Sequence, residues 1–435
     1  MAPLVSYMKN TARPLNTTVT ACPSCDLLLT GTTARENHAA LCPRCHELLH
    51  RDKHNSIVKT FSLSLTALLL YIPALFLPLL TMGILGTEST TSIIHATYNL
   101  FVQQQFFVGL IVFLTAVIFP FFTLFSLCAV SFGLLTNHRK KWMPWMFRHY
   151  NHLREWAMTD VFLVGILITI VKMAHSAEID FNLGFFCFVS LVVVTIASQT
   201  ASDRRLFWAL LERTGTKAVP SPPKPVAPRK DSHDARHVVC HTCHKMVWSN
   251  KEATQSCAKC PRCGEKLHHR KRNSIVRTWA LLCTAILFTF PANMLPIMEV
   301  EYFGVPERST IMDGIIYFFQ EGSYGIGIVI LTASILVPLF KIIGLTIILL
   351  SIHFQWHAGL RRKTAMFRLI EFVGRWSMLD IFVIALLCTL VQFGFLSTIS
   401  TAPAAFYFTC VVVSTMLAAV TFDTRLLWDN YESTS

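Results

Sequence analysis

Eight of the fourteen cysteines occur in Cys-x-x-Cys pairs, the pattern of a metal-binding knuckle. The pairs form two clusters, Cys22, Cys25, Cys42 and Cys45, and Cys240, Cys243, Cys260 and Cys263. Both clusters have the spacing Cys-x2-Cys-x16-Cys-x2-Cys, at which two knuckles can fold together and offer four thiolates tetrahedrally to Zn²⁺. Four thiolates leave no open coordination position for water, so we predict two structural zinc ribbons rather than catalytic zinc.

Two other chemistries remain open for these cysteines, namely redox-active thiols and an iron-containing cluster. Disulfide bonds are a third, but the regular pairs favour metal on the reducing, cytoplasmic side of a membrane. Cys257 lies three residues before Cys260 and could compete with it as a ligand. Because the first cluster has no counterpart of Cys257, we interpret this residue as a spare thiol.

The rest of the chain has the composition of a membrane protein. Hydrophobic residues make up 53% of the sequence and charged residues only 14%. Eight apolar segments are long enough to cross a bilayer as helices, at roughly residues 59–80, 105–135, 157–174, 184–208, 277–298, 324–352, 377–396 and 404–428. The sequence therefore predicts an all-α polytopic membrane protein.

The formal net charge of +13 is explained by topology rather than by nucleic-acid binding. Most Lys and Arg residues lie in short segments beside the apolar runs, and these alternate with basic-poor loops at residues 87–99, 175–182 and 299–321. Under the positive-inside rule the basic segments face the cytoplasm. Both termini and both cysteine clusters are then predicted to be cytoplasmic, with no nucleic acid as partner.

The second half of the chain repeats the first. A shift of 218 residues superimposes the two cysteine clusters, and also Asn55-Ser-Ile-Val58 on Asn273-Ser-Ile-Val276 and Pro120 on Pro338. Past the second span the offset becomes 220, which matches Asp160 to Asp380. Since each copy begins on the cytoplasmic side and has an even number of spans, the copies are parallel repeats.

These features predict seven regions. They are an N-terminal tail at 1–20, a zinc ribbon at 21–54, a transmembrane module at 55–214, a Pro-rich linker at 215–237, a second ribbon at 238–272, a second transmembrane module at 273–429 and a C-terminal tail at 430–435. Each module is expected to contain four spans, kinked at the repeated prolines.

The second transmembrane module is the more polar of the two inside its spans. Lys341 lies near the middle of the sixth span, where Thr123 stands in the first module. Ionisable groups at this depth are costly and are functional candidates. Our candidate transport site is a Lys341–Asp380 pair fringed by hydroxyl groups. Its members are Ser334, Lys341, Ser377, Asp380 and Thr415.

Two structural interpretations of the same residues stay open. Lys341 and Asp380 can form a buried ion pair with no role beyond stability, or Asp380 can cap a helix at the membrane interface.

Several stretches of this sequence resemble the paraquat-inducible protein A (PqiA/LetA) family. They are the Cys-Pro-x-Cys knuckles, Gly374-Arg-Trp-Ser-Met-Leu-Asp-Ile-Phe382, Ala402-Pro-Ala-Ala-Phe-Tyr-Phe408 and Asp423-Thr-Arg-Leu-Leu-Trp428. The resemblance covers nearly the whole chain. It implies a Gram-negative inner-membrane protein whose four-helix modules are tetraspanin-like.

The same resemblance implies the partners and the cargo. Family members work beside a periplasm-spanning tunnel protein built of MCE domains, and phospholipid passes between the inner and outer membranes, which maintains the outer membrane. The polar cluster of the second module is the family's functional centre, and the five residues named above stand at its positions.

Three functions follow as expectations. The first is a lipid transport component that is not an enzyme, since the chain lacks a Walker-type nucleotide-binding motif. The second is a structural anchor that holds the tunnel without moving lipid. The third is a membrane redox or stress protein, which is disfavoured because the spans lack paired histidines at haem-like spacing.

Overall fold

Each half of the chain folds as a helical bundle joined to a small four-cysteine ribbon. The computed structural model describes residues 20–29, 39–51, 53, 55–84, 87–138, 140–173, 178–212, 237–248, 259–302, 305–322, 324–356, 358–391 and 397–429. The predicted linker apart from His237, most of both predicted tails, and Cys257 lie outside these ranges.

In the first half, two short hairpins build ribbon 1, from β1 (Thr20–Ala21), β2 (Leu28–Leu29), β3 (Ala39–Leu41) and β4 (Leu48–Arg51). The long helices of module 1 are α2 (Ser56–Phe76), α4 (Phe106–Phe113) continuing through η1 (Leu114–Ile118) into α5 (Phe119–Leu135), α7 (Thr159–Met173) and α8 (Leu183–Ala201). Two shorter helices, α6 (Trp142–Leu153) and α9 (Arg204–Glu212), lie at the ribbon end.

The second half repeats this order. Ribbon 2 contains β8 (His237–Val239) and β9 (Met246–Trp248). Module 2 contains α10 (Ser274–Met294), α12 (Tyr324–Leu331) continuing through η3 (Thr332–Leu336) into α13 (Val337–His353), α14 (Leu360–Gly374), η4 (Arg375–Met378), α15 (Leu379–Leu390), α16 (Ala404–Thr421) and α17 (Leu426–Asp429). The element order confirms two tandem modules.

Among the described residues, seven helical segments are long and apolar enough to cross a membrane. The predicted third span is the shorter helix α7. The predicted fourth and eighth spans end earlier than expected, at Ala201 and Thr421, because the chain turns before the amphipathic helices α9 and α17.

A hydroxyl fixes each of these turns, and it belongs to the repeated Asn-Ser-Ile-Val motif. Ser56 Oγ donates to the carbonyl of Ala201 at 2.7 Å and accepts from the backbone N–H of Asp203 at 3.0 Å. Ser274 makes the equivalent bonds at the end of α16, at 2.9 and 3.0 Å. The motif therefore joins the first long helix of each module, α2 or α10, to its last long helix, α8 or α16.

The long second helix of each module contains one π-helical turn just before its repeated proline. These turns are η1 before Pro120 and η3 before Pro338. A π turn displaces the helix hydrogen-bond ladder and is frequent at functional sites. In module 1 the Tyr71 hydroxyl donates to the carbonyl of Val117 in η1.

Three-stranded antiparallel sheets form at the predicted basic-poor loops, and each sheet also includes one strand from outside those loops. In module 1 the order is β6 (Thr87–Thr91), β5 (Leu80–Ile84) and β7 (Glu178–Phe181), and in module 2 it is β11 (Val305–Ser309), β10 (Met298–Tyr302) and β12 (Ser397–Thr401). Each central strand pairs with a strand from a distant part of the chain, which a local pattern does not reveal. The short helices α3 (Ile93–Val102) and α11 (Ile311–Gln320) follow the hairpins.

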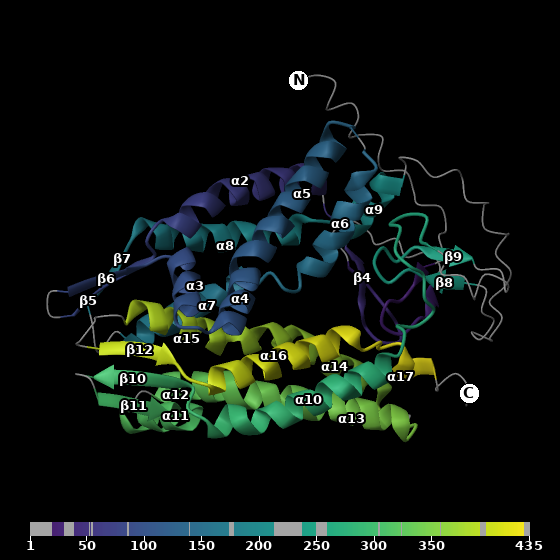
Figure 1. Cartoon of the computed structure of the whole chain (residues 1–435). Coiled ribbons are helices and arrows are strands. Elements are labelled where there is room, and N and C mark those ends of the chain that lie inside the picture. The colour runs from purple at the N-terminus through teal and green to yellow at the C-terminus, as the bar shows by residue number, and fades with distance from the viewer. Residues whose placement is uncertain are drawn as a thin grey trace.

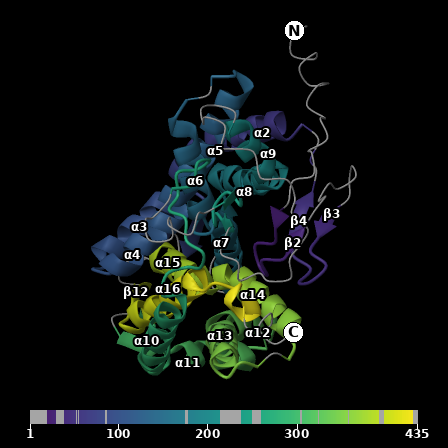
Figure 2. The same ribbon diagram turned by 90° about the vertical axis from the view of Figure 1, so that its right-hand side faces the viewer.

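The molecule has two different ends. Both three-stranded sheets lie at one end and both ribbons lie at the other, with the long helices between them (Figure 1). The modules meet where α7 contacts α15 (Figure 2), and there the rings of Phe162 and Phe382 pack edge to face with centroids 5.3 Å apart. The α15 helix is buried along its length, which places it at the centre of the protein.

Candidate functional site

The four knuckles of the ribbons share one backbone geometry. In each, the residue after the second cysteine donates its N–H to the carbonyl of the first cysteine, at 2.8–3.0 Å. That residue has a positive φ, and it is Asp26, His46, His244 or Gly264. This tight turn directs the backbone and both sulfur atoms of a pair toward one point.

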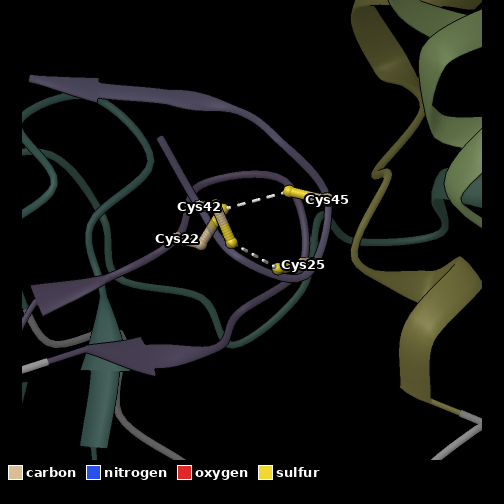
Figure 3. A group of neighbouring side chains, drawn as sticks. All are labelled: Cys22, Cys25, Cys42 and Cys45. Carbon is tan, nitrogen blue, oxygen red and sulfur yellow. Dashed lines mark hydrogen bonds between the residues drawn. The ribbon is translucent and has the colours of Figure 1, made fainter. Parts of the chain in front are cut away.

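The sulfur atoms of each cluster converge on a common centre, with all four within 4.8 Å of one another. Figure 3 shows the first cluster. Cys22 and Cys45 Sγ are 3.5 Å apart and Cys25 and Cys42 Sγ are 3.6 Å apart. Thiolates about 2.3 Å from a tetrahedral Zn²⁺ have sulfur–sulfur distances of about 3.8 Å. Both buried four-cysteine clusters thus have the donor set and dimensions of a metal site, as predicted.

The second cluster has the same dimensions, with Cys240 and Cys263 Sγ 3.4 Å apart and Cys243 and Cys260 Sγ 3.5 Å apart. Contacts among these thiols lower the pKa of Cys260 and raise that of Cys243. In a bound state the metal would replace the thiol protons.

Lys341 is buried inside module 2, as its sequence position predicted. Only 1% of its surface is exposed. Its Nζ donates a 3.0 Å hydrogen bond to Ser377 Oγ, which lies in η4 immediately before α15. The structure therefore brings together two members of the predicted cluster, from helices separated in sequence. The pairing of Lys341 with Asp380 stays a prediction.

Two other members of the cluster line a common cavity. Ser334, in the π turn η3, and Asp380, in the first turn of α15, both contribute to its wall. The cavity has a volume of about 60 Å³ and most of its other lining residues are apolar. This volume holds a few water molecules, whereas a site for a drug-sized molecule needs about 300 Å³ or more. The fifth member, Thr415, is buried in α16 and donates to the carbonyl of Val412 at 2.9 Å.

The sequence analysis missed part of this cavity. Thr310, Gly314 and Phe318 reach it from α11, and Ile168 reaches it from α7 of the other module. A detectable signal was present, because Thr310 and Asp313 form a capping box at the start of α11. The contribution of Ile168 depends on the packing of one module against the other, for which the sequence has no local signal.

Comparison with known proteins agrees with the repeated architecture. The model of the family described as Paraquat-inducible protein A matches residues 57–212 and 275–432, which are the two transmembrane modules. Both ribbons lie outside the matched residues. No solved structure matches this chain.

Curated relatives match over most of their length. The chain is 32% identical to Lipophilic envelope-spanning tunnel protein A of Escherichia coli (strain K12) over 412 residues, covering 95% of this chain and 91% of the relative. It is 30% identical to Intermembrane transport protein PqiA of the same strain, covering 94% and 95%. A Probable intermembrane transport protein of Haemophilus influenzae is 29% identical, covering 94% and 96%. With both modules matched by the family model, the chain belongs to the paraquat-inducible protein A family.

Proposed function

We propose that this protein is the inner-membrane component of a lipid transport system. It loads or receives phospholipid and exchanges it with a periplasm-spanning tunnel protein built of MCE domains, which maintains the outer membrane. The observation that carries the proposal is the buried Lys341, held by Ser377 in the core of module 2. The names of the relatives, which include intermembrane transport, support the same role.

A lysine at this position has a chemical use in lipid handling. Its ammonium group is a point charge that attracts a phosphate headgroup, while apolar helix faces accommodate acyl chains. Thr123 stands at the matching position of module 1, so the positive charge is specific to module 2. Ser334 and Asp380, which line the cavity, would then meet the headgroup from η3 and α15.

The cavity as it stands is too small for a lipid. We therefore propose that module 2 opens between η3 and α15 to admit one. The π turn supports this idea because its hydrogen-bond ladder is already displaced at Ser334. The helix can bend there without breaking a full set of backbone hydrogen bonds.

The two ends of the molecule suggest its orientation. Arg and Lys residues surround the ribbon end, which we place in the cytoplasm together with both termini. The sheet end would then face the periplasm and the tunnel protein. We propose that both four-cysteine clusters bind structural Zn²⁺, since a closed four-thiolate site has no position for a substrate.

The direct test is photo-crosslinking of lipid at the cavity. A photoreactive amino acid replaces Ser334 in cells whose phospholipids are radiolabelled. After irradiation the protein is purified, and the radioactivity bound covalently to it is measured. The control places the same amino acid at Ala116, the matching π-turn position in module 1. We expect label at position 334 that exceeds the label at position 116 and falls when Lys341→Met is added.

A second measurement separates transport from anchoring. Envelope integrity is compared between cells with Lys341→Met and cells with Thr123→Val, each at normal protein levels. The transport proposal expects a defect with Lys341→Met alone. Intact envelopes together with equal labelling at positions 334 and 116 would instead leave the protein as an anchor for the tunnel.

A further inference from the structure

Ribbon 1 packs its cysteine cluster against the transmembrane module of the other half of the chain. Its four cysteines belong to one buried apolar cluster with side chains of module 2. The module 2 members include Leu345 and Ile348 of α13, Phe367 of α14 and Trp428 of α17. Figure 2 shows β2 and β4 of ribbon 1 on the same side of the molecule as α14.

Charged and polar contacts fix this docking. Arg368 of α14 lies 2.6 Å from the carboxylate of Glu47, and it also donates to the carbonyl of Cys45 at 3.1 Å. The guanidinium of Arg44, in the same knuckle, lies 4.5 Å from the centre of the Trp428 ring.

Two further arginines of the second half hold the first knuckle. Arg270 pairs with Asp26 at 2.7 Å, and Arg425, which is only 3% exposed, donates to the carbonyl of Pro23 at 3.1 Å. The first half of the chain thus supplies the knuckle, and the second half supplies the arginines that contact it.

Ribbon 2 is docked in the reciprocal manner on module 1. Its four cysteines share a buried cluster with Leu127 and Val130 of α5, Phe147 of α6 and Trp208 of α9. Arg148 Nε lies 3.5 Å from Glu265.

The carboxylate of Glu212, at the end of α9, pairs with both Lys245 and Arg262 of ribbon 2. These contacts lower the pKa of Glu212 although burial acts to raise it. Ribbon 2 therefore has its own ion pairs with the opposite half of the chain.

The two interfaces use equivalent positions of the repeat. Glu47 and Glu265 are related by the offset of 218, and Arg148 and Arg368 by the offset of 220. The pair Arg368–Glu47 in one interface thus corresponds to Arg148–Glu265 in the other. Reciprocal use of one surface is the arrangement of a domain-swapped dimer, here within one chain.

The length of the connection does not impose this exchange. Ribbon 1 ends with β4 at Arg51, and α2 of its own module begins at Ser56. Such a short connection would favour docking on the adjacent module if tethering alone decided. The cysteines of ribbon 1 nevertheless pack against the opposite module, so the tether is not what places the ribbon.

We propose that each ribbon is a metal-dependent clamp for the transmembrane module of the other half. The metal of ribbon 1 stabilises the fold of the ribbon, and the ribbon then holds α14 and α17 of module 2. Lys341 lies on α13, and Ser377 follows α14 in η4. Metal binding by the first half of the chain therefore supports the buried polar site in the second half. This proposal does not depend on which substrate the protein moves.

Hydrogen–deuterium exchange of the full-length protein tests the clamp. The first variant carries Cys25→Ser and Cys42→Ser, and the matched variant carries Cys243→Ser and Cys260→Ser. We expect the first variant to raise amide exchange in α14 about tenfold and to leave α6 unchanged, and the matched variant to do the reverse. The proposal would be overturned if loss of a cluster raised amide exchange in the module that follows that cluster in sequence. Equal increases in both modules, or no increase in either, would also overturn it.

Charge exchange gives a test that leaves the cysteines intact. Arg368→Glu alone is expected to raise exchange in α14 by a few fold, because an acidic pair replaces an ion pair. Adding Glu47→Arg should restore the wild-type rate. Adding Glu265→Arg instead should not, since Glu265 belongs to the ribbon on module 1. Restoration by Glu265→Arg and not by Glu47→Arg would show that each ribbon docks on its own module.

Discussion

Lys341 is the buried residue whose role is hardest to explain by stability alone. An ionisable group inside an apolar bundle is costly, and one hydrogen bond of 3.0 Å to the neutral hydroxyl of Ser377 compensates only part of that cost. Many apolar side chains would fill the same volume at lower cost. The presence of a lysine at this point therefore favours a function.

Stability and function should respond differently to substitutions of this pair. Lys341→Met removes the charge and keeps the length of the side chain, so we expect an unchanged or raised midpoint of thermal unfolding together with lost transport. Ser377→Ala keeps the charge and removes the hydroxyl that accepts its hydrogen bond, which should cost about 1–3 kcal/mol. Thermal unfolding of the purified protein in detergent measures both. A large loss of stability with Lys341→Met would favour a structural role.

At the scale of elements, close backbone contacts set how the four helices of a module pack. Gly184 begins the last helix of module 1, and a Cβ at this position would collide with the carbonyl oxygen atoms of Pro78 and Leu77. Backbone atoms cannot rotate away as a flexible side chain can. The loop after α2 and the start of α8 can therefore approach only because residue 184 is glycine.

Gly184→Ala should accordingly destabilise module 1. We expect a loss on the order of 1–3 kcal/mol from overpacking, seen as a lower midpoint of thermal unfolding. Gly314→Ala is the matched control, since a Cβ there would meet no atom within 4 Å and α11 is helical. That control should be neutral or slightly stabilising, because alanine is the better helix former. Equal effects of the two changes would rule out the steric explanation.

For the whole molecule, the two four-cysteine clusters join halves that are distant in sequence. Loss of metal from one ribbon should therefore affect the transmembrane module of the opposite half and not that ribbon alone. The cysteine thiols bind metal only after they lose their protons, and the binding free energy of a structural site contributes to folding.

Metal content gives a direct measure of these sites. Elemental analysis of the purified chain should find two equivalents of zinc, falling to one with Cys25→Ser and Cys42→Ser combined. Cys257→Ser should retain two, since our interpretation makes this residue a spare thiol. Iron in place of zinc, or a loss of zinc with Cys257→Ser, would contradict the assignment.

Features that depend on local pattern could be predicted from the amino-acid sequence. The cysteine spacing predicted both metal sites, the apolar runs predicted the long helices, and the offset of 218 predicted tandem modules, all in agreement with the structure. The position of Lys341 within an apolar run also predicted its burial. These features are visible because metal ligands and membrane spans impose short and regular constraints on a sequence.

Contacts between distant segments, by contrast, became known from the folded structure alone. The sheets β6-β5-β7 and β11-β10-β12, the contribution of Ile168 to the cavity, and the exchange of the ribbons between halves all depend on contacts across long stretches of chain. The internal repeat makes the exchange undetectable from sequence. Glu47 and Glu265 are equivalent, and so are Arg148 and Arg368, so their types fit docking on either module. The choice between them depends on packing in three dimensions.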